Sequence, residues 1–123
     1  MSITFDSWAW IEYFAGSELG NSVRRYIESE EQIYTPSISF MEIKSKYIHE
    51  GKPFEERLKF MEERSSVVDI DKEIAIEAAT LKASEGLPSI DALVYACARR
   101  SKTKLLTADS HFEKIGGAEF LRK

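Results

Sequence analysis

The sequence predicts a single α/β domain over residues 1–123, a three-layer α/β/α sandwich with a central, mostly parallel sheet. Short apolar runs alternate along the chain with longer amphipathic segments, which favours a parallel sheet covered on both faces. The chain has 123 residues, enough for one hydrophobic core, and 43% of them are hydrophobic and 31% charged. We find no repeat, low-complexity tract or linker that would divide it.

Five of the apolar runs are short enough to be strands of such a sheet. The expected strands are Ser2–Asp6, Gln32–Thr35, Ser66–Ile70, Lys104–Thr107 and Ala118–Leu121. The segments between them have apolar residues at helical spacing. The expected helices are Trp8–Phe14, Leu19–Ser29, Ser39–Glu50, Phe54–Arg64, the segment from Asp71 to Gly86, and Ser89–Arg100, with a helical turn at Ser110–Lys114.

Residues that favour helix ends support these boundaries. The expected caps are Ser7, Asp71 and Ser89, and the expected stops are Gly16, Gly51 and Gly86. Ile74, Ala78 and Leu81 fall on one stripe of their helix, so we expect them in the core.

Four acids stand inside or at the end of apolar runs. Asp91 is the only charged residue between Leu87 and Ala98, and the other three acids are Asp6, Glu42 and Asp109. An ionised carboxylate in apolar surroundings is costly unless it is paired, hydrogen-bonded or bound to a metal. Ligands of open α/β sheets gather at the carboxyl ends of the strands, and all four acids are expected at that edge. The set therefore predicts a cation site built from oxygen ligands.

Each acid taken alone also has a purely structural interpretation. Asp6 and Asp109 could cap the helices that follow them, and Asp91 could favour a helix dipole. Glu42 stands three residues after Ser39, which is the spacing of a capping box. Caps need not be embedded in apolar runs or fall at one edge of a sheet, so the joint pattern favours the cation site.

Other sites receive less support from the sequence. His49 and His111 are isolated in sequence, and we expect both to be surface or hydrogen-bonded residues. The glycines are expected at element ends, which argues against a phosphate-cradling loop. The net charge of −4 makes the chain as a whole a poor electrostatic attractant for nucleic acid. The basic run 99–104 is expected to be a solvated helix end that contributes modestly to contact with phosphates.

The sequence also predicts the cellular compartment and whether the protein contacts a membrane. No apolar run approaches membrane-spanning length, and the N-terminus lacks a signal pattern. Cys97 is the only cysteine, so no internal disulfide can form, which agrees with a reducing compartment. We therefore expect a cytoplasmic protein without a membrane contact.

Four segments together resemble the small VapC-type toxins among the PIN-domain ribonucleases, and the resemblance covers nearly the whole chain. The segments that carry it are Phe5–Phe14, Pro36–Glu42, Ile90–Ala96 and Leu105–Phe112, each with one of the four acids. Trp8 departs from the pattern, since many relatives have a small polar residue there.

The resemblance implies a PIN-like fold and a ribonuclease that is the toxin of a type II toxin–antitoxin pair. It implies that Asp6, Glu42, Asp91 and Asp109 are catalytic and hold Mg²⁺ or Mn²⁺, and that Thr107 supports the site through its hydroxyl. Ser39, the hydroxyl residue of the second segment, is a further supporting candidate. It also implies a homodimer and a cognate antitoxin that covers the active-site groove.

Physical reasoning gives the same chemistry, because a hard cation on carboxylates would lower the pKa of a water and shield an RNA phosphate. Single-stranded or looped RNA would be the natural substrate. Two alternatives remain at this stage. One is a catalytically silent PIN-like module that binds RNA or protein. The other is a receiver-type signalling domain, which also has Mg²⁺-binding acids at strand ends.

Overall fold

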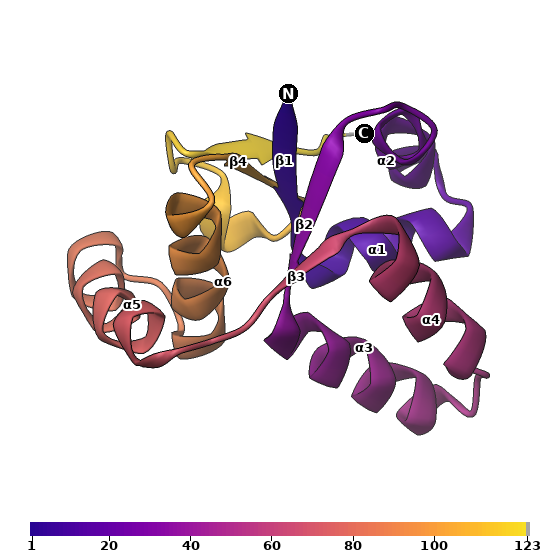
Figure 1. Ribbon diagram of the computed structural model, residues 1–123, viewed down its shortest axis with the longest axis horizontal. Coiled ribbons are helices and arrows are strands. Elements are labelled where there is room, and N and C mark those ends of the chain that lie inside the picture. Colours follow the sequence, from indigo (N-terminus) through magenta and orange to yellow (C-terminus); the bar gives the residue numbers. More distant parts are fainter. Residues whose placement is uncertain (123) are drawn as a thin grey trace.

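The computed structural model describes residues 1–122, in which a five-stranded sheet is flanked by helices on both faces (Figure 1). The elements in chain order are β1 (Ser2–Phe5), α1 (Ser7–Ala15), α2 (Glu18–Ile27), β2 (Gln32–Pro36), α3 (Ser37–Glu50), α4 (Glu55–Arg64), β3 (Ser66–Val68), α5 (Lys72–Glu85), α6 (Ser89–Arg100), β4 (Lys104–Thr107), the 3₁₀ turn η1 (Ser110–Phe112) and β5 (Ala118–Phe120). The predicted α/β fold class is confirmed.

The strands lie in the order β3-β2-β1-β4-β5, and all four neighbouring pairs are parallel. Ile3 faces Ile33 on one side and Lys104 on the other, so β1 is central. A receiver-type domain has the order 2-1-3-4-5, in which the first strand lies between the second and third. Here β4 takes the place of β3 beside β1, and this excludes the receiver alternative.

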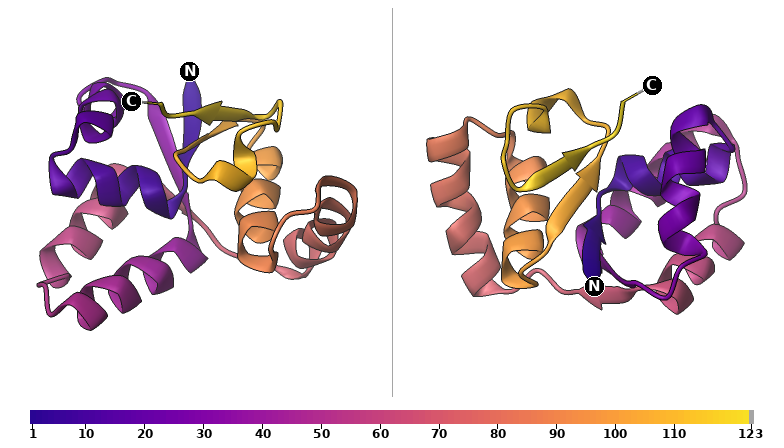
Figure 2. Two further views of the ribbon diagram at one scale, coloured as in Figure 1. Left: turned by 180° about the vertical axis from the view of Figure 1, so that it is seen from behind. Right: turned by 90° about the horizontal axis from the view of Figure 1, so that it is seen from above.

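Two hydrophobic clusters occupy the two faces of the sheet. Leu105 packs with α5 and α6, whereas Leu106 joins Ile3 and Phe5 in a cluster with α1 to α4. Consecutive residues of β4 thus point to opposite faces, as the pleat of a strand requires. Figure 2 shows α5 and α6 on one side of the strands and α1 to α4 on the other. Among the described residues, no helix has the length and apolar character needed to cross a bilayer.

Several predicted boundaries are wrong by one or two residues, and three of the differences matter for the site. Asp6 rather than Ser7 caps α1, since its side chain accepts a hydrogen bond from Ala9 N. Helix α3 begins at Ser37 rather than Ser39, so Ser39 forms no capping box with Glu42. Helix α6 has Pro88 at its N-cap, and Ser89 is its first residue.

Two further differences concern β3 and a glycine. Strand β3 ends at Val68 instead of Ile70. Gly20 lies inside α2 rather than at an element end, where a Cβ atom would come 2.1 Å from the carbonyl oxygen of Glu12. The crossing of α1 and α2 therefore depends on a residue without a side chain at this point. In contrast, Asp71 caps α5 as predicted, and Ile74, Ala78 and Leu81 are buried.

Candidate metal centre

The four acids predicted from the sequence line one cavity. The cavity has a volume of about 210 Å³ and lies at the carboxyl end of β1 and β4. It is lined by Asp6, Ser7, Trp8, Ile11, Glu42, Lys46, Asp91, Val94, Asp109 and Phe112. In Figure 1, α3 begins directly below the end of β2, which brings its first turns to this edge of the sheet. The predicted convergence of acids from four separate segments is confirmed.

Asp6 is held by both of its carboxylate oxygens. Oδ1 accepts from Ala9 N at 2.8 Å, which fixes the cap of α1, and Oδ2 accepts from the hydroxyl of Thr107. The same Thr107 hydroxyl oxygen accepts from Asp109 N at 2.9 Å. Thr107 therefore couples the ends of β1 and β4, and its predicted contact with the site is present.

Glu42 is held by a residue that the sequence did not single out as a partner. Ser7 donates from Oγ to Glu42 Oε1 at 2.6 Å, which joins the first residue of α1 to α3. Ser39, one turn before Glu42, is fully buried, and its Oγ has no hydrogen-bond partner among residues 1–122. The supporting role predicted for Ser39 stays a prediction.

His111 is exposed and partnered, as expected, but both of its partners are acids of the cavity. Its Nδ1 lies 2.9 Å from Asp91 Oδ2 and 2.8 Å from Asp109 Oδ1. Together these three residues offer possible ligand atoms that all lie within 4.8 Å of one another. The signal in the sequence was the two-residue spacing between Asp109 and His111 after a strand, where the turn η1 brings the ring back over the carboxylates.

The surroundings raise the pKa values of three of the acids. Burial raises the pKa of Asp6 to about 7, against the hydrogen bonds from Thr107 and Ala9, and the nearby carboxylates of Asp109 and Glu42 add to the rise. Burial also raises the pKa of Asp91 to about 6, with Asp109 as the next cause and His111 acting in the opposite direction.

Glu42 follows the same direction. Burial raises its pKa, the hydrogen bond from Ser7 lowers it, and the charge of Asp109 raises it. A raised pKa means that the surroundings disfavour the negatively charged form of a carboxylate, so a cation bound nearby would stabilise that form. The donors are mainly carboxylate oxygens, which suit hard cations such as Mg²⁺ or Mn²⁺. The donor set thus fits a divalent cation.

The basic run 99–104 lies far from these acids along α6. Asp91 is in the first turn of α6, and Arg99 and Arg100 are in its last turn. Arg99 pairs with Glu77 at 2.7 Å, and Arg100 lies 3.2 Å from Asp71. The two arginines therefore tie α6 to α5 at the surface, and the contribution of the run to RNA contact stays a prediction.

Comparison with known proteins agrees with this fold. The PIN domain family matches residues 3–118, and the chain belongs to that family. A search of curated proteins finds no match.

Several solved structures with a similar fold come from toxin–antitoxin systems. A toxin–antitoxin complex from Klebsiella pneumoniae is 21% identical with a TM-score of 0.80, over 95% of this chain and 95% of that one. A Mycobacterium tuberculosis toxin that cleaves the sarcin–ricin loop is 14% identical with a TM-score of 0.76, over 98% and 99%. A VapBC complex of Rickettsia felis bound to promoter DNA is 16% identical with a TM-score of 0.71, over 99% and 100%.

Proposed function

We propose that this PIN domain is an endoribonuclease that depends on Mg²⁺ or Mn²⁺ and is the toxin of a type II toxin–antitoxin pair. The observation that carries the proposal is the single cavity lined by Asp6, Glu42, Asp91 and Asp109, three of which have raised pKa values. Their local partners are hydrogen-bond donors and one histidine, so the site has the features of a cation site.

The four acids would hold the cation, and other residues would position them. Thr107 keeps Asp6 in place, and Ser7 does the same for Glu42. When bound, a divalent cation would supply an activated water and neutralise charge on the scissile phosphate. The apolar side chains of Val94 and Phe112 line the same cavity and would limit the water around the reacting group.

The biological setting is part of the proposal. The similar structures include a toxin that cleaves RNA and complexes of toxins with antitoxins, and they support an RNA substrate and a neutralising antitoxin protein. We propose that the chain acts in the cytoplasm as a homodimer, in agreement with the resemblance of its four acidic segments. Size-exclusion chromatography with light scattering would test the dimer, and a neighbouring short gene for a DNA-binding protein would identify the antitoxin.

Incubation with a pool of single-stranded RNA tests the activity. We expect cleavage in Mg²⁺, no cleavage in excess EDTA, and no cleavage by the Asp91→Asn variant in Mg²⁺. Asp69→Asn is the matched control, because Asp69 is exposed and does not line the cavity. Cleavage that persists unchanged in excess EDTA would refute the mechanism, and its absence in every condition would favour the catalytically silent alternative.

A further inference from the structure

A second hollow adjoins the acidic cavity on the side of α1, α3 and α4. Its volume is about 260 Å³. It is lined by Trp8, Ile11, Glu12, Phe14, Ala15, Lys46, Tyr47, Glu50, Lys52 and Arg57. Trp8, Ile11 and Lys46 line both hollows, so the two adjoin at these side chains. Below we call the second hollow the basic hollow.

Trp8 places a large aromatic side chain on the surface of α1. The residue is 42% exposed, whereas Trp10, two positions later, is fully buried and donates to Thr35 Oγ1. Trp8 thus leaves a large aromatic surface open to solvent on the boundary between the acidic cavity and the basic hollow. Nucleic acid bases of any sequence stack on such rings.

The charge of the basic hollow is opposite to that of the acidic cavity. Three cations, Lys46, Lys52 and Arg57, line it against the carboxylates of Glu12 and Glu50. Lys46 Nζ lies 2.6 Å from the Glu50 carboxylate, and Lys52 Nζ lies 3.3 Å from the same group. One carboxylate therefore pairs with two ammonium groups. On a chain of net charge −4, this local excess of cations favours a phosphate directly beside the acidic cavity.

Arg57 adds a rigid wall to the hollow. Its guanidinium lies 4.6 Å from the ring centroid of Tyr47 and 5.8 Å from that of Phe14. The two aromatic contacts and a hydrogen bond from Arg57 Nη1 to the carbonyl oxygen of Pro53 at 3.4 Å restrain the guanidinium, and its other N–H groups can contact an anion. The hollow combines fixed positive charge with an aromatic rim, which are the two features of a single-strand binding groove.

We propose that the basic hollow holds the nucleotide next to the cleaved phosphate of a single-stranded RNA. Trp8 stacks on its base, and Lys52 and Arg57 contact its backbone. This inference rests on the proposed function, because the acidic cavity is taken as the place of the cleaved phosphate. It assigns Trp8, Lys52 and Arg57 to substrate binding and makes recognition of this nucleotide tolerant of base identity.

Fluorescence anisotropy with a labelled ten-nucleotide oligoadenylate in Mg²⁺ tests the binding. All variants are made on the Asp91→Asn background, so that the proposed cleavage does not consume the probe. Trp8→Ala should weaken binding about fivefold to a hundredfold, and Trp8→Phe should lose much less. Ile76→Ala on α5 is the matched control, since it also removes an exposed apolar side chain and should leave binding unchanged.

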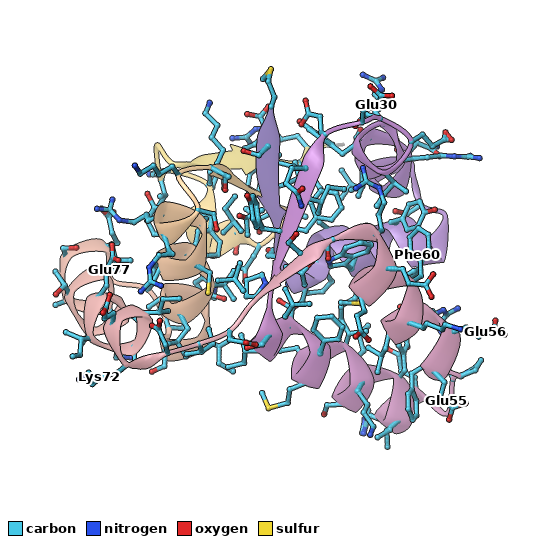
Figure 3. All side chains as sticks on the ribbon, in the orientation of Figure 1. Glu30, Glu55, Glu56, Phe60, Lys72 and Glu77 are labelled. Carbon is cyan, nitrogen blue, oxygen red and sulfur yellow. The ribbon has the colours of Figure 1, made fainter. Side chains whose placement is uncertain are left out.

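The charge contribution is tested by salt dependence. Lys52→Gln should weaken binding and reduce the slope of log affinity against log salt by roughly the share of one phosphate contact. Lys72→Gln is the control, because Lys72 lies on α5 at the opposite side of the molecule from Glu55, Glu56 and Phe60 of α4 (Figure 3). An equal slope change for both variants would refute the proposed phosphate contact.

An abasic strand distinguishes stacking from other losses. Replacing the bases by abasic residues should weaken binding to the Asp91→Asn protein, and this penalty should disappear in the Trp8→Ala variant. Equal affinities of the Trp8→Ala and Ile76→Ala variants would overturn the proposal, even if the protein cleaves RNA in Mg²⁺. Loss of affinity for a partner protein with unchanged RNA affinity would assign Trp8 to protein docking and also overturn it. Trp8-dependent binding without chelator-sensitive cleavage by the unmodified protein would keep Trp8 as an RNA contact and refute the proposed function.

Discussion

Replacing Asp6 by Asn should stabilise the protein at neutral pH in the absence of a divalent cation. The pKa of Asp6 is about 7 in the folded protein, against 3.8 as the reference for the unfolded chain. Below pH 3.8 both states are protonated and the site carries no penalty. As pH rises toward 7, the unfolded chain gives up its proton more readily, and the folded state loses relative stability.

The magnitude follows from the difference between the two pKa values. At 1.36 kcal/mol per pKa unit, a rise from 3.8 to about 7 corresponds to a loss of about 4 kcal/mol, complete above pH 7. Asparagine has no such charge, and its side-chain oxygen can accept the bond from Ala9 N that caps α1. At pH 8 in EDTA we expect Asp6→Asn to gain up to about 4 kcal/mol, a gain that fades toward pH 4.

Urea unfolding at pH 4, 6 and 8, with EDTA or with Mg²⁺, measures this difference. Asp71→Asn is the matched control, because Asp71 also caps a helix, accepting from Ile74 N at 2.9 Å. Its pKa is lowered by that backbone bond and by Arg100, so its contribution is present at neutral pH and is lost as pH falls through the lowered value. Asp71→Asn should therefore be the less stable variant at pH 8, with a defect that shrinks in acid.

Mg²⁺ gives the second part of the test. A cation that binds only the folded site should stabilise the unmodified protein and the Asp71→Asn variant, and Asp6→Asn much less. If Asp6→Asn lowers stability at pH 8 in EDTA as a lost cap would, or if Mg²⁺ protects all three proteins equally, Asp6 is a structural residue and the reasoning about the site is wrong.

Three further predictions concern the supports of the site and the fold. Thr107→Val keeps the shape but removes a hydroxyl that makes two hydrogen bonds, so urea unfolding should show a loss of about 1–3 kcal/mol, with Thr107→Ser close to the unmodified protein. Gly20→Ala should lower the free energy of unfolding by about 1–3 kcal/mol, because the added Cβ meets a backbone oxygen. Helix propensity alone would predict a gain in stability. Gly116→Ala, with open space around the added Cβ, should be nearly neutral in the same assay. Arg64→Met should lower the melting temperature through a loss of about 2 kcal/mol, since the guanidinium donates to four backbone carbonyls around the end of α2, and an unchanged melt would show that water replaces it.

The regular elements and the identity of the acids could be predicted from the sequence. Period-two and helical spacing depend on neighbours within a few residues, and so do the glycine stops at Gly16, Gly51 and Gly86, each of which is left-handed in the structure. Boundaries were less predictable where two cap residues compete. Both Asp6 and Ser7 favour a helix start, and Asp6 takes the cap while Ser7 turns its hydroxyl to Glu42.

The sequence by itself therefore determined the fold class, the core stripe of α5 and the four acids that meet at one edge of the sheet. Only the tertiary structure decided the raised pKa values of Asp6, Glu42 and Asp91 and the partners of the acids, because those depend on contacts between distant segments. Thr107 reaches Asp6 from 101 residues away, and Ser7 reaches Glu42 from 35 residues away. The place of His111 beside two carboxylates and the shared border of the acidic cavity and the basic hollow likewise arise where separate helices and strands meet. The burial of a side chain and the electrostatic potential at it depend on all of its neighbours in space, whereas local sequence patterns contain information only about neighbours along the chain.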